Sequence, residues 1–469
     1  MSFVCHAAGK GNPKPEIRNP KEGRNPKAES GEVSAENGLN RLSFFIRISG
    51  FGFLSTLRSA ATEDGSDLGF RFSDFLPAPP LHTLHPMRLL ARITCFCLAS
   101  LFASPLVAAT LPRADLDFLR DMTRDVVQAS RVAPGSNGGG RWPITNSCGF
   151  TLITPGKDTY TAFWVRDFAM AVDSGFITAE ELRNALLLIC RAQNGAAELK
   201  LANGLHVPPW TIPDHINYDG KASFYPGSYS SGPDQGNGTC GRVPPIDDHY
   251  EFVHIAYTYW KNTGDVAFFA TDVGGLTLFE RLEKAFAAPT IDAKTGLAET
   301  TEADRAVGFG FCDAETHTGK LLFASLLRYR AAGEMAELCR ATRHREQVRG
   351  FREAQKKIRA SLATTFADPN GKDGWLLAST GISRQPDVWG TLYALDLDVL
   401  DRAHAAAARK TVADAVRRGT ITFEGGVRHV PTDRDFSQSS AWERSIVPGN
   451  TYQNGGYWHT ATGWLIAAL

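Results

Sequence analysis

Acidic residues stand beside arginine and aromatic residues at several points in this sequence, and one such point interrupts an apolar helical pattern. The stretch TYTAFWVRDFAM, residues 159–170, is apolar on almost all sides from Phe163 onward, yet it carries Arg166 and Asp167 side by side. Charged side chains are rarely buried without a partner, and adjacent residues on a helix do not face each other. Asp167 follows Trp164 by three residues, so the two share a helical face. An acid and an indole directed into one space indicate the wall of a pocket for a polyhydroxylated ligand.

Two further stretches offer carboxyl groups suited to acid–base chemistry. GFGFCDAETHTGKLLF, residues 308–323, places Asp313 and Glu315 between phenylalanines and an apolar helix, an environment that holds a carboxyl group protonated. SAWERS, residues 440–445, places Glu443 beside a tryptophan. Cleavage of a glycosidic bond needs two carboxyl groups that flank the bond, one protonated and one ionised. The sequence supplies candidates for both roles. It leaves open the choice between Asp313 and Glu315, and surface pairing with an arginine is the other interpretation of Glu443.

Other catalytic chemistries lack their sequence patterns. The sequence has no phosphate-binding P-loop, no GxSxG and no HExxH. Asp247, Asp248 and His249 could ligate a metal, but the spacing of a calcium-binding loop is absent. The five cysteines after residue 109 form no CxxC pair, so they indicate either one or two disulfides or buried free thiols. We expect neither a metal nor a cofactor.

Helical periodicity dominates the chain after residue 109. Apolar segments alternate with amphipathic ones, and short loops join them in pairs. An apolar helix needs cover on most sides, whereas an amphipathic helix keeps one face in water. Two concentric layers satisfy both demands, which predicts an all-α (α/α)6 toroid; a helical solenoid without a converging centre is the alternative. The expected helices cover residues 113–131, 163–174, 178–194, 248–262, 265–286, 318–332, 335–365, 388–398, 400–418 and 457–468.

The segments that precede the apolar helices share a composition. Each mixes acids, amides or arginine with aromatic residues and glycine, as in RVPPIDDHYE, which contains Asp248, and in YQNGGYWHTATGW near the end of the chain. In a toroid the inner helices run parallel, so five such segments meet at one mouth and line one pocket. Helix capping alone accounts for the aspartates but not for the arginine and aromatic residues beside them. Residues 196–247, rich in glycine, proline and aromatic residues, are expected to lie over this pocket as a long loop.

The N-terminal part is not expected to belong to the folded domain. Residues 1–86 have little to bury and are predicted to be a disordered or non-native extension. Residues 87–109 combine two arginines, an apolar core and a small-residue cleavage site, which is typical of a secretory signal peptide that starts at Met87. Its apolar run is too short for a good membrane span. Residues 110–469 then form a secreted or periplasmic catalytic domain.

The charge balance gives no support to a strongly charged partner. The chain has 50 basic and 50 acidic residues, of which residues 1–109 hold 12 and 9, leaving 38 and 41 in the remainder. Nucleic-acid binding needs a basic face, so no nucleic-acid partner is expected. A lyase acting on an acidic polysaccharide would also need a basic cleft. The sequence makes no prediction about the oligomeric state.

YTAFWVRDFAM resembles the YxxxWxRD stretch of glucoamylases and related glycogen-debranching enzymes, and the chain more broadly resembles the six-hairpin glycosidases. The resemblance implies that Arg166 and Asp167 hold hydroxyl groups of the terminal sugar in the innermost subsite. It also implies that the catalytic acid opens a later inner helix, where Asp313 or Glu315 stands. The family run has a tryptophan next to a paired glutamate there, and this chain has neither.

YQNGGYWHTATGW resembles the Asn-Gly-Gly-aromatic-His segment of several enzymes with this toroid, including disaccharide phosphorylases. For the catalytic base of a glycosidase, the candidate is Glu443, with Glu424 in TFEGGVRH as the substitute. The pocket residues implied by this segment are Asn454, Tyr457, Trp458 and His459.

Together these patterns predict a secreted, exo-acting glycoside hydrolase, inverting by the family resemblance. The alternatives are a disaccharide phosphorylase or a polysaccharide lyase on the same toroid, and a non-catalytic carbohydrate-binding protein. A six-hairpin toroid has about twelve helices, whereas the pattern gives ten and the chain stops in GWLIAAL, within an inner-type helix. Either residues 420–455 hold helices that the pattern does not reveal, or the toroid is incomplete at the C-terminus, which is the expectation we favour.

Overall fold

The computed structural model of the chain describes residues 112–138, 144–156, 160–201, 206–224, 242–308, 315–369, 371, 373–381, 385–434, 444–445, 452 and 455–469. The predicted extension and signal peptide lie outside these residues. The chain divides into two compact units, Arg58–Val126 and Met1–Leu57 with Val127–Leu469. Most of α3 (Arg113–Ala129), an amphipathic helix, belongs to the first unit. The helices and strands below belong to the second.

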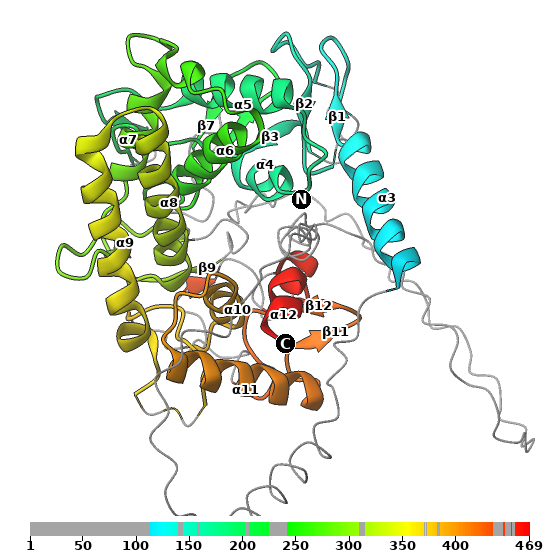
Figure 1. Cartoon of the computed structure of the whole chain (residues 1–469), viewed down its shortest axis with the longest axis vertical. Coiled ribbons are helices and arrows are strands. Elements are labelled where there is room, and N and C mark those ends of the chain that lie inside the picture. The colour runs from blue at the N-terminus through cyan, green and yellow to red at the C-terminus, as the bar shows by residue number, and fades with distance from the viewer. Residues whose placement is uncertain are drawn as a thin grey trace, which may run out of the picture. The chain divides into compact units, whose positions relative to one another are not determined.

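In the part of this unit that the structure describes, five inner helices contact one another in series and four outer helices cover them (Figure 1). The inner helices are α4 (Val165–Val172), α6 (Asp248–Thr263), α8 (Leu322–Ala341), α10 (Val388–Asp396) and α12 (Thr462–Ala468). The outer helices are α5 (Ala179–Ala192), α7 (Leu278–Ala287), α9 (Arg345–Phe366) and α11 (Arg402–Arg418). Two short 3-10 helices, η1 (Ala267–Ala270) and η3 (His459–Ala461), complete the set.

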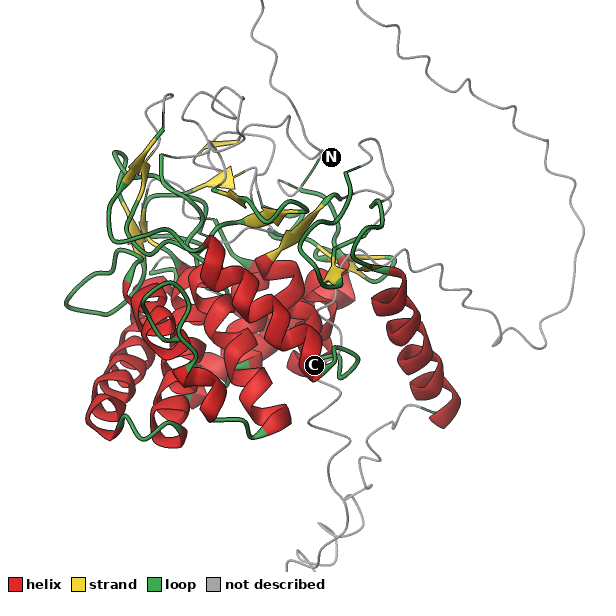
Figure 2. Cartoon of the chain, turned by 90° about the horizontal axis from the view of Figure 1, so that it is seen from above, coloured by secondary structure: helices red, strands yellow, loops and turns green. Residues whose placement is uncertain are grey.

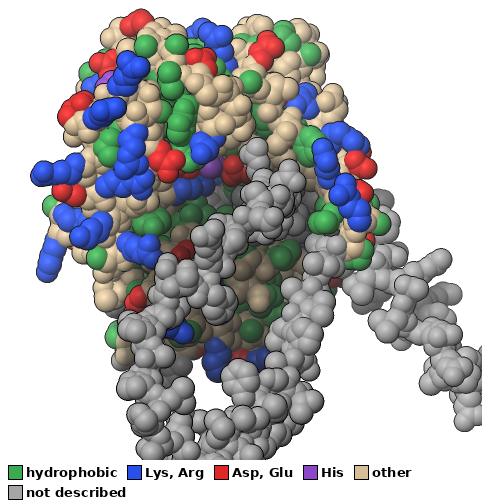
Figure 3. Space-filling model, in the orientation of Figure 1, with side chains coloured by type: hydrophobic (Ala, Val, Ile, Leu, Met, Phe, Trp, Pro, Cys, Tyr) green, Lys and Arg blue, Asp and Glu red, His purple; other side chains and the backbone are tan. Residues whose placement is uncertain are grey.

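Burial follows the apolar pattern of each helix. In α10 every residue from Val388 to Leu395 is buried, as an inner position requires. The partner helix α11 buries one narrow stripe, formed by Ala405, Ala408, Val412 and Ala415, and keeps its opposite face in water. The predicted fold class, an all-α arrangement of helical pairs in two layers, is confirmed. Figure 3 shows that the visible face is hollowed inside the arc of helices and that acidic and basic side chains are interspersed around it.

The strands are short and lie with most loops on one side of the helices (Figure 2). This is the side of the inner-helix N-termini, because β3 (Ala162–Trp164) runs directly into α4 and β10 (Gly319–Lys320) leads into α8. All pairs are antiparallel: β1 (Arg131–Val132) with β2 (Leu152–Ile153), β3 with β6 (His215–Asn217), β6 with β7 (Ala222–Ser223), β4 (Leu199–Lys200) with β5 (His206–Val207), β8 (Glu299–Thr300) with β10, β9 (Glu315–Thr316) with β13 (Arg444–Ser445), and β11 (Thr422–Phe423) with β12 (Gly426–Val427).

The helix boundaries differ most from the sequence prediction at three places. The expected helix 265–286 is divided into η1 and α7, with Gly274 and Gly275 at positive φ between them. The break expected near Gly333 lies instead at Arg343, where φ is 69°. Gly333 stays inside α8 because its missing side chain leaves room for Gln355 of α9. The helix expected from residue 457 begins later, because its first residues are extended beside β12.

The cysteines that can be placed are free thiols. Cys190 and Cys339 are buried and Cys148 is half-buried, which confirms the free-thiol interpretation for these three. Cys240 and Cys312 lie outside the described residues. Among the described helices, none combines the length and the apolar character needed to cross a membrane.

An ionic cluster ties the inner helices together within the core. His254 of α6 lies between two carboxylates, with Nδ1 2.6 Å from Glu334 of α8 and Nε2 3.1 Å from Asp173, the C-cap of α4. Arg330 of α8 donates to Glu251 of α6. Burial and Arg330 lower the pKa of His254, but Glu334 and Asp173 outweigh them and raise it to about 10. The imidazolium therefore stabilises the fold together with both carboxylates.

Replacing His254 by leucine should lower the free energy of unfolding by about 3–5 kcal/mol, because the change removes the cation that lies closest to the buried carboxylate of Glu334. The contribution of His254 is fully present below about pH 6.5, its ordinary pKa, and is lost as the pH rises through 10. Urea denaturation at pH 6 and pH 9.5 should therefore show a larger difference between wild type and variant at pH 6.

The matched control is His404→Leu, which removes an exposed partner of Asp401 and should change stability little, because solvent screens the pair. Equal losses in the two variants would contradict a stabilising role for the buried cluster.

Candidate active site

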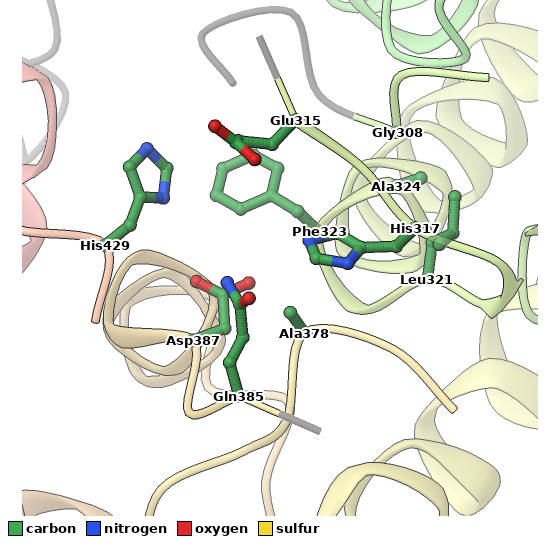
Figure 4. A pocket seen from close by; sticks show the side chains of 10 residues that line it. All are labelled: Gly308, Glu315, His317, Leu321, Phe323, Ala324, Ala378, Gln385, Asp387 and His429. Atoms are coloured by element: carbon green, nitrogen blue, oxygen red, sulfur yellow. The ribbon is translucent and has the colours of Figure 1, made fainter. Parts of the chain in front are cut away.

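A pocket opens between the segments that precede α8 and α10 and the segment that follows β12. Its empty space, part of which is open to solvent, is about 480 Å³. Figure 4 shows the carboxyl groups of Glu315 and Asp387 and the imidazole of His429 around one space. The other lining residues are Gly308, His317, Leu321, Phe323, Ala324, Ala378 and Gln385.

A cluster of aromatic rings from three inner helices reaches this pocket through one member, Phe323. Phe323 of α8 lines it and stacks on Tyr393 of α10, with ring centroids 5.2 Å apart and planes 17° apart. Trp464 of α12 packs against both, at 5.7 Å from Phe323 and 4.9 Å from Tyr393. The pocket therefore combines one aromatic ring, Phe323, with carboxyl and imidazole groups, a combination that suits a ring with one apolar face and several hydroxyl groups.

Glu315 is positioned by strand β9. Its side chain is buried, with 2% of the residue exposed. Strand β9 pairs with β13 so that Ser445 lies opposite Glu315. Arg305, itself buried, donates to the carbonyl and hydroxyl oxygens of Thr316 at 3.4 and 3.3 Å and so holds the strand. Of the two predicted acids, the structure thus places Glu315 in the pocket, whereas Asp313 lies outside the described residues.

Asp387 is the second carboxyl group of the pocket, and the sequence analysis did not single it out. It is the N-cap of α10, where its Oδ1 accepts the Gly390 N–H at 2.8 Å. Burial raises its pKa to about 7, although the N–H groups of Gly390 and Trp389 oppose the shift. A carboxyl group with this pKa can hold a proton near neutral pH. The available signal was its place at the end of STGISRQPD, directly before an apolar helix.

The side chain of Arg166 is bonded to three aspartates. Its Nε donates to Asp247 and its Nη2 to Asp248, both at 2.9 Å, and Nη2 also donates to Asp214. His215 in turn lies 2.7 Å from Asp214. All four charged residues are buried, so the guanidinium faces the protein's own acids.

One guanidinium cannot neutralise three carboxylates. The pKa values of two of these aspartates therefore shift in opposite directions. Burial opposes ionisation of Asp214, but Arg166 and His215 overcome it and lower its pKa to about 2. Burial and the neighbouring Asp247 and Asp214 raise the pKa of Asp248 well above its ordinary value, despite Arg166. Asp214 is therefore ionised and Asp248 holds its proton more firmly than a free aspartic acid.

Asp167 differs from its neighbour. It is half-buried, and apart from its own backbone N–H it has no hydrogen-bond or ion-pair partner among the residues that the structure describes. Burial raises its pKa to about 7, against the effect of Arg166. The expected shared helical face with Trp164 is wrong, because Trp164 ends strand β3 and stacks on His215, with centroids 4.5 Å apart. The cause is the pairing of β3 with β6, which extends the backbone there.

The Arg166 cluster and the pocket lie beside one another. The N–H of Ile246, directly before Asp247, bonds to the carbonyl oxygen of Val307 at 3.1 Å. Gly308, the next residue, lines the pocket. The aspartates held by Arg166 therefore fix the segment that forms one edge of the pocket.

The C-terminal residues predicted for the pocket gather at the β11–β12 hairpin. Tyr457 packs against Phe423, 37% of it is exposed, and Trp458 bridges to Val427. His459 lies 3.3 Å from the carbonyl oxygen of Glu424, an exposed turn residue with φ of 47°. None of these four described residues, Tyr457, Trp458, His459 and Glu424, lines the pocket that contains Glu315. Asn454 and Glu443 lie outside the described residues.

The described histidine, cysteine, aspartate and glutamate side chains form no group arranged to hold a metal ion. The pocket's polar side chains are a glutamate, an aspartate, a glutamine and two histidines. This donor set suits hydrogen bonding and proton transfer.

Solved structures with partial likeness to this chain include three sugar enzymes. A glucoamylase from Saccharomycopsis fibuligera is 12% identical, with a TM-score of 0.43, and the match covers 77% of this chain and 74% of that one. A sugar epimerase from a ruminal bacterium is 13% identical, with a TM-score of 0.39 over 73% and 79% of the two chains. A rhamnosidase from Klebsiella oxytoca is 14% identical, with a TM-score of 0.37, and the match covers 55% of this chain and less than half, 43%, of the rhamnosidase.

No protein-family model and no curated protein matches the sequence. The assignment of the fold rests on the helices described above.

The two neighbours Arg166 and Asp167 should respond oppositely to substitution. Arg166→Met should lower the free energy of unfolding by about 3–5 kcal/mol, because it leaves three buried aspartates without their cation. Asp167→Asn should leave stability at pH 8 unchanged or raise it, because the wild-type carboxyl group, with a pKa of about 7, is ionised there against the cost of burial.

Chemical denaturation of both variants at pH 8 checks this division. An Arg166→Met variant as stable as wild type, or an Asp167→Asn variant equally destabilised, would show that the roles are assigned wrongly.

Proposed function

We propose that this protein is a glycoside hydrolase that acts on the ends of oligo- or polysaccharide chains. The observation that carries the proposal is one pocket with two buried carboxyl groups, Glu315 and Asp387, beside the aromatic ring of Phe323. Glycosidic cleavage needs paired carboxyl groups, and a sugar ring packs its apolar face on aromatic side chains. The paired-helix fold and the YxxxWxRD resemblance support the same function.

In the proposed mechanism Glu315 donates a proton to the glycosidic oxygen. Asp387 is the second candidate for this role, because burial raises its pKa to about 7, and Asp313 remains a third from the sequence. Glu443, directly before strand β13 in the sequence, is proposed as the base that activates water, whereas the predicted substitute Glu424 is exposed and does not line the pocket. An inverting enzyme would hold its acid and base roughly 6.5–9.5 Å apart.

Substrate binding is assigned to residues in two regions, the one around Arg166 and the C-terminal one beside the β11–β12 hairpin. Asp167 supplies an unpaired carboxylate for sugar hydroxyl groups, and Arg166 and Asp248 hold the segment that carries the pocket edge. Trp164, Tyr457, Trp458, His459 and Asn454 are proposed to contact more distant sugar units. We further propose that the protein is secreted or periplasmic, with a signal peptide from Met87 and a catalytic domain from about residue 110.

Hydrolysis is favoured over the two other reactions considered for this fold. A phosphorylase must bind phosphate, and a lyase must bind an acidic sugar, so both need a cationic pocket. None of the described lining residues is lysine or arginine. A catalytic protein is favoured over a non-catalytic sugar-binding protein because carboxyl groups with raised pKa values cluster at catalytic sites, and burial raises the pKa of Asp387 to about 7.

Incubation of the full chain with a panel of oligosaccharides, with NMR of the released sugar, tests the function and the anomeric outcome together. Glu315→Gln should lower kcat by about 10²–10⁴-fold if Glu315 is the acid, because proton donation is lost while the shape of the pocket is kept. Asp387→Asn is assayed in parallel.

The matched control is Glu353→Gln, which changes an exposed glutamate on α9 that pairs with Arg349. It should leave kcat unchanged. Near-normal kcat in both pocket variants would remove the proposed acid, and no turnover of any substrate by wild type would favour a binding protein.

A further inference from the structure

His429 has a buried nitrogen without a hydrogen-bond partner among the described residues. The residue is 5% exposed, and its Nε2 is enclosed but unpaired. Leaving a buried polar atom unpaired costs about 1–3 kcal/mol. Such atoms are rare in native folds and are often explained by a ligand or water that occupies the site.

The imidazole is held firmly in place. It stacks on Trp389, with ring centroids 3.7 Å apart and planes 23° apart. Trp389 is itself anchored, since its Nε1 donates to the carbonyl oxygen of Val427 at 3.2 Å. The carbonyl oxygen of His429 accepts the N–H of Val388, the first residue of α10, at 2.8 Å. The ring is thus prepared for a partner before any ligand arrives.

The charge state of His429 indicates which chemical groups can bond to its Nε2. Burial, reinforced by His317, lowers the pKa of His429 to about 3, so the ring is neutral at ordinary pH. A neutral imidazole has one donor and one acceptor nitrogen. A hydroxyl group, which both donates and accepts, suits either tautomer.

We propose that His429 is a hydroxyl-recognition residue of the pocket, in which its Nε2 bonds to a hydroxyl group of an uncharged sugar ring. Asp387 lines the same pocket and supplies a second hydrogen-bonding group from the start of α10 (Figure 4). An anionic ring is disfavoured, because the described lining holds two carboxyl groups and no lysine or arginine. The inference rests on the proposed function in one respect, that the ligand is a sugar.

The test is His429→Phe in the full chain, which keeps a ring to stack on Trp389 and removes both nitrogens. Calorimetric titration with the methyl glycosides of glucose, mannose and galactose should give a Kd about tenfold or more higher than for wild type. The thermal midpoint should stay the same or rise, because the substitution removes an unpaired buried atom. A purely structural histidine would not show weaker binding with undiminished stability.

The matched control is His344→Phe. His344 also stacks on an aromatic ring, Phe279, at 3.9 Å, but its Nδ1 lies 2.8 Å from the hydroxyl oxygen of Thr342 and it does not line the pocket. This variant should bind all three glycosides as wild type does.

Three results would overturn the inference: an unchanged Kd in His429→Phe, failure of wild type to bind any of the three glycosides, or a clear fall in the thermal midpoint of His429→Phe. The last would mean that an ordered water already satisfies Nε2. Binding that depends on His429 without hydrolysis of any oligosaccharide would remove the proposed function and leave this inference standing. Hydrolysis of an oligosaccharide by wild type, together with an unchanged Kd in His429→Phe, would support the proposed function and remove this inference.

Discussion

The burial of one guanidinium among three aspartates is the constraint on which the candidate site depends. Arg166 enters at the start of α4, and its partners come from the residue before β6 and from the start of α6. Each of these charges would be costly to bury alone, so the three segments must meet. The meeting fixes Ile246 against Val307 and thereby the edge of the pocket at Gly308. The segments that precede the inner helices thus form both the stabilising Arg166 cluster and the edge of the candidate binding pocket.

A helix start gives the pocket one of its two carboxyl groups, and this side chain, Asp387, serves two purposes. Asp387 caps α10 by accepting a backbone N–H, which a helix start requires, and it also faces the pocket. A capping aspartate at a helix terminus on the surface would be ionised and solvated. Here burial keeps the carboxyl group close to protonation at neutral pH. On the side of the helical layer where the inner helices begin, one carboxyl group therefore both caps a helix and lines the pocket.

The sequence predicted the helices well and the contacts between them poorly. Apolar and amphipathic segments alternate in a local pattern, so α11 was expected at 400–418 and lies at Arg402–Arg418. The partners of Arg166 stand about 50 and 80 residues away, and periodicity carries no information about them. Trp164 was assigned to a helix because its pairing with His215 through β3 and β6 is equally non-local. His429, in the run GGVRHV, resembles a core histidine until its unpaired nitrogen and the pocket are seen together.

The central claim is that a sugar ring binds between Glu315, Asp387 and His429. A crystal structure of the full chain with a bound oligosaccharide tests this most directly. The account predicts a terminal ring in this pocket, with one face toward Phe323 and a hydroxyl group bonded to His429 Nε2. A sugar bound only elsewhere on the molecule, with this pocket filled by ordered water, would contradict it.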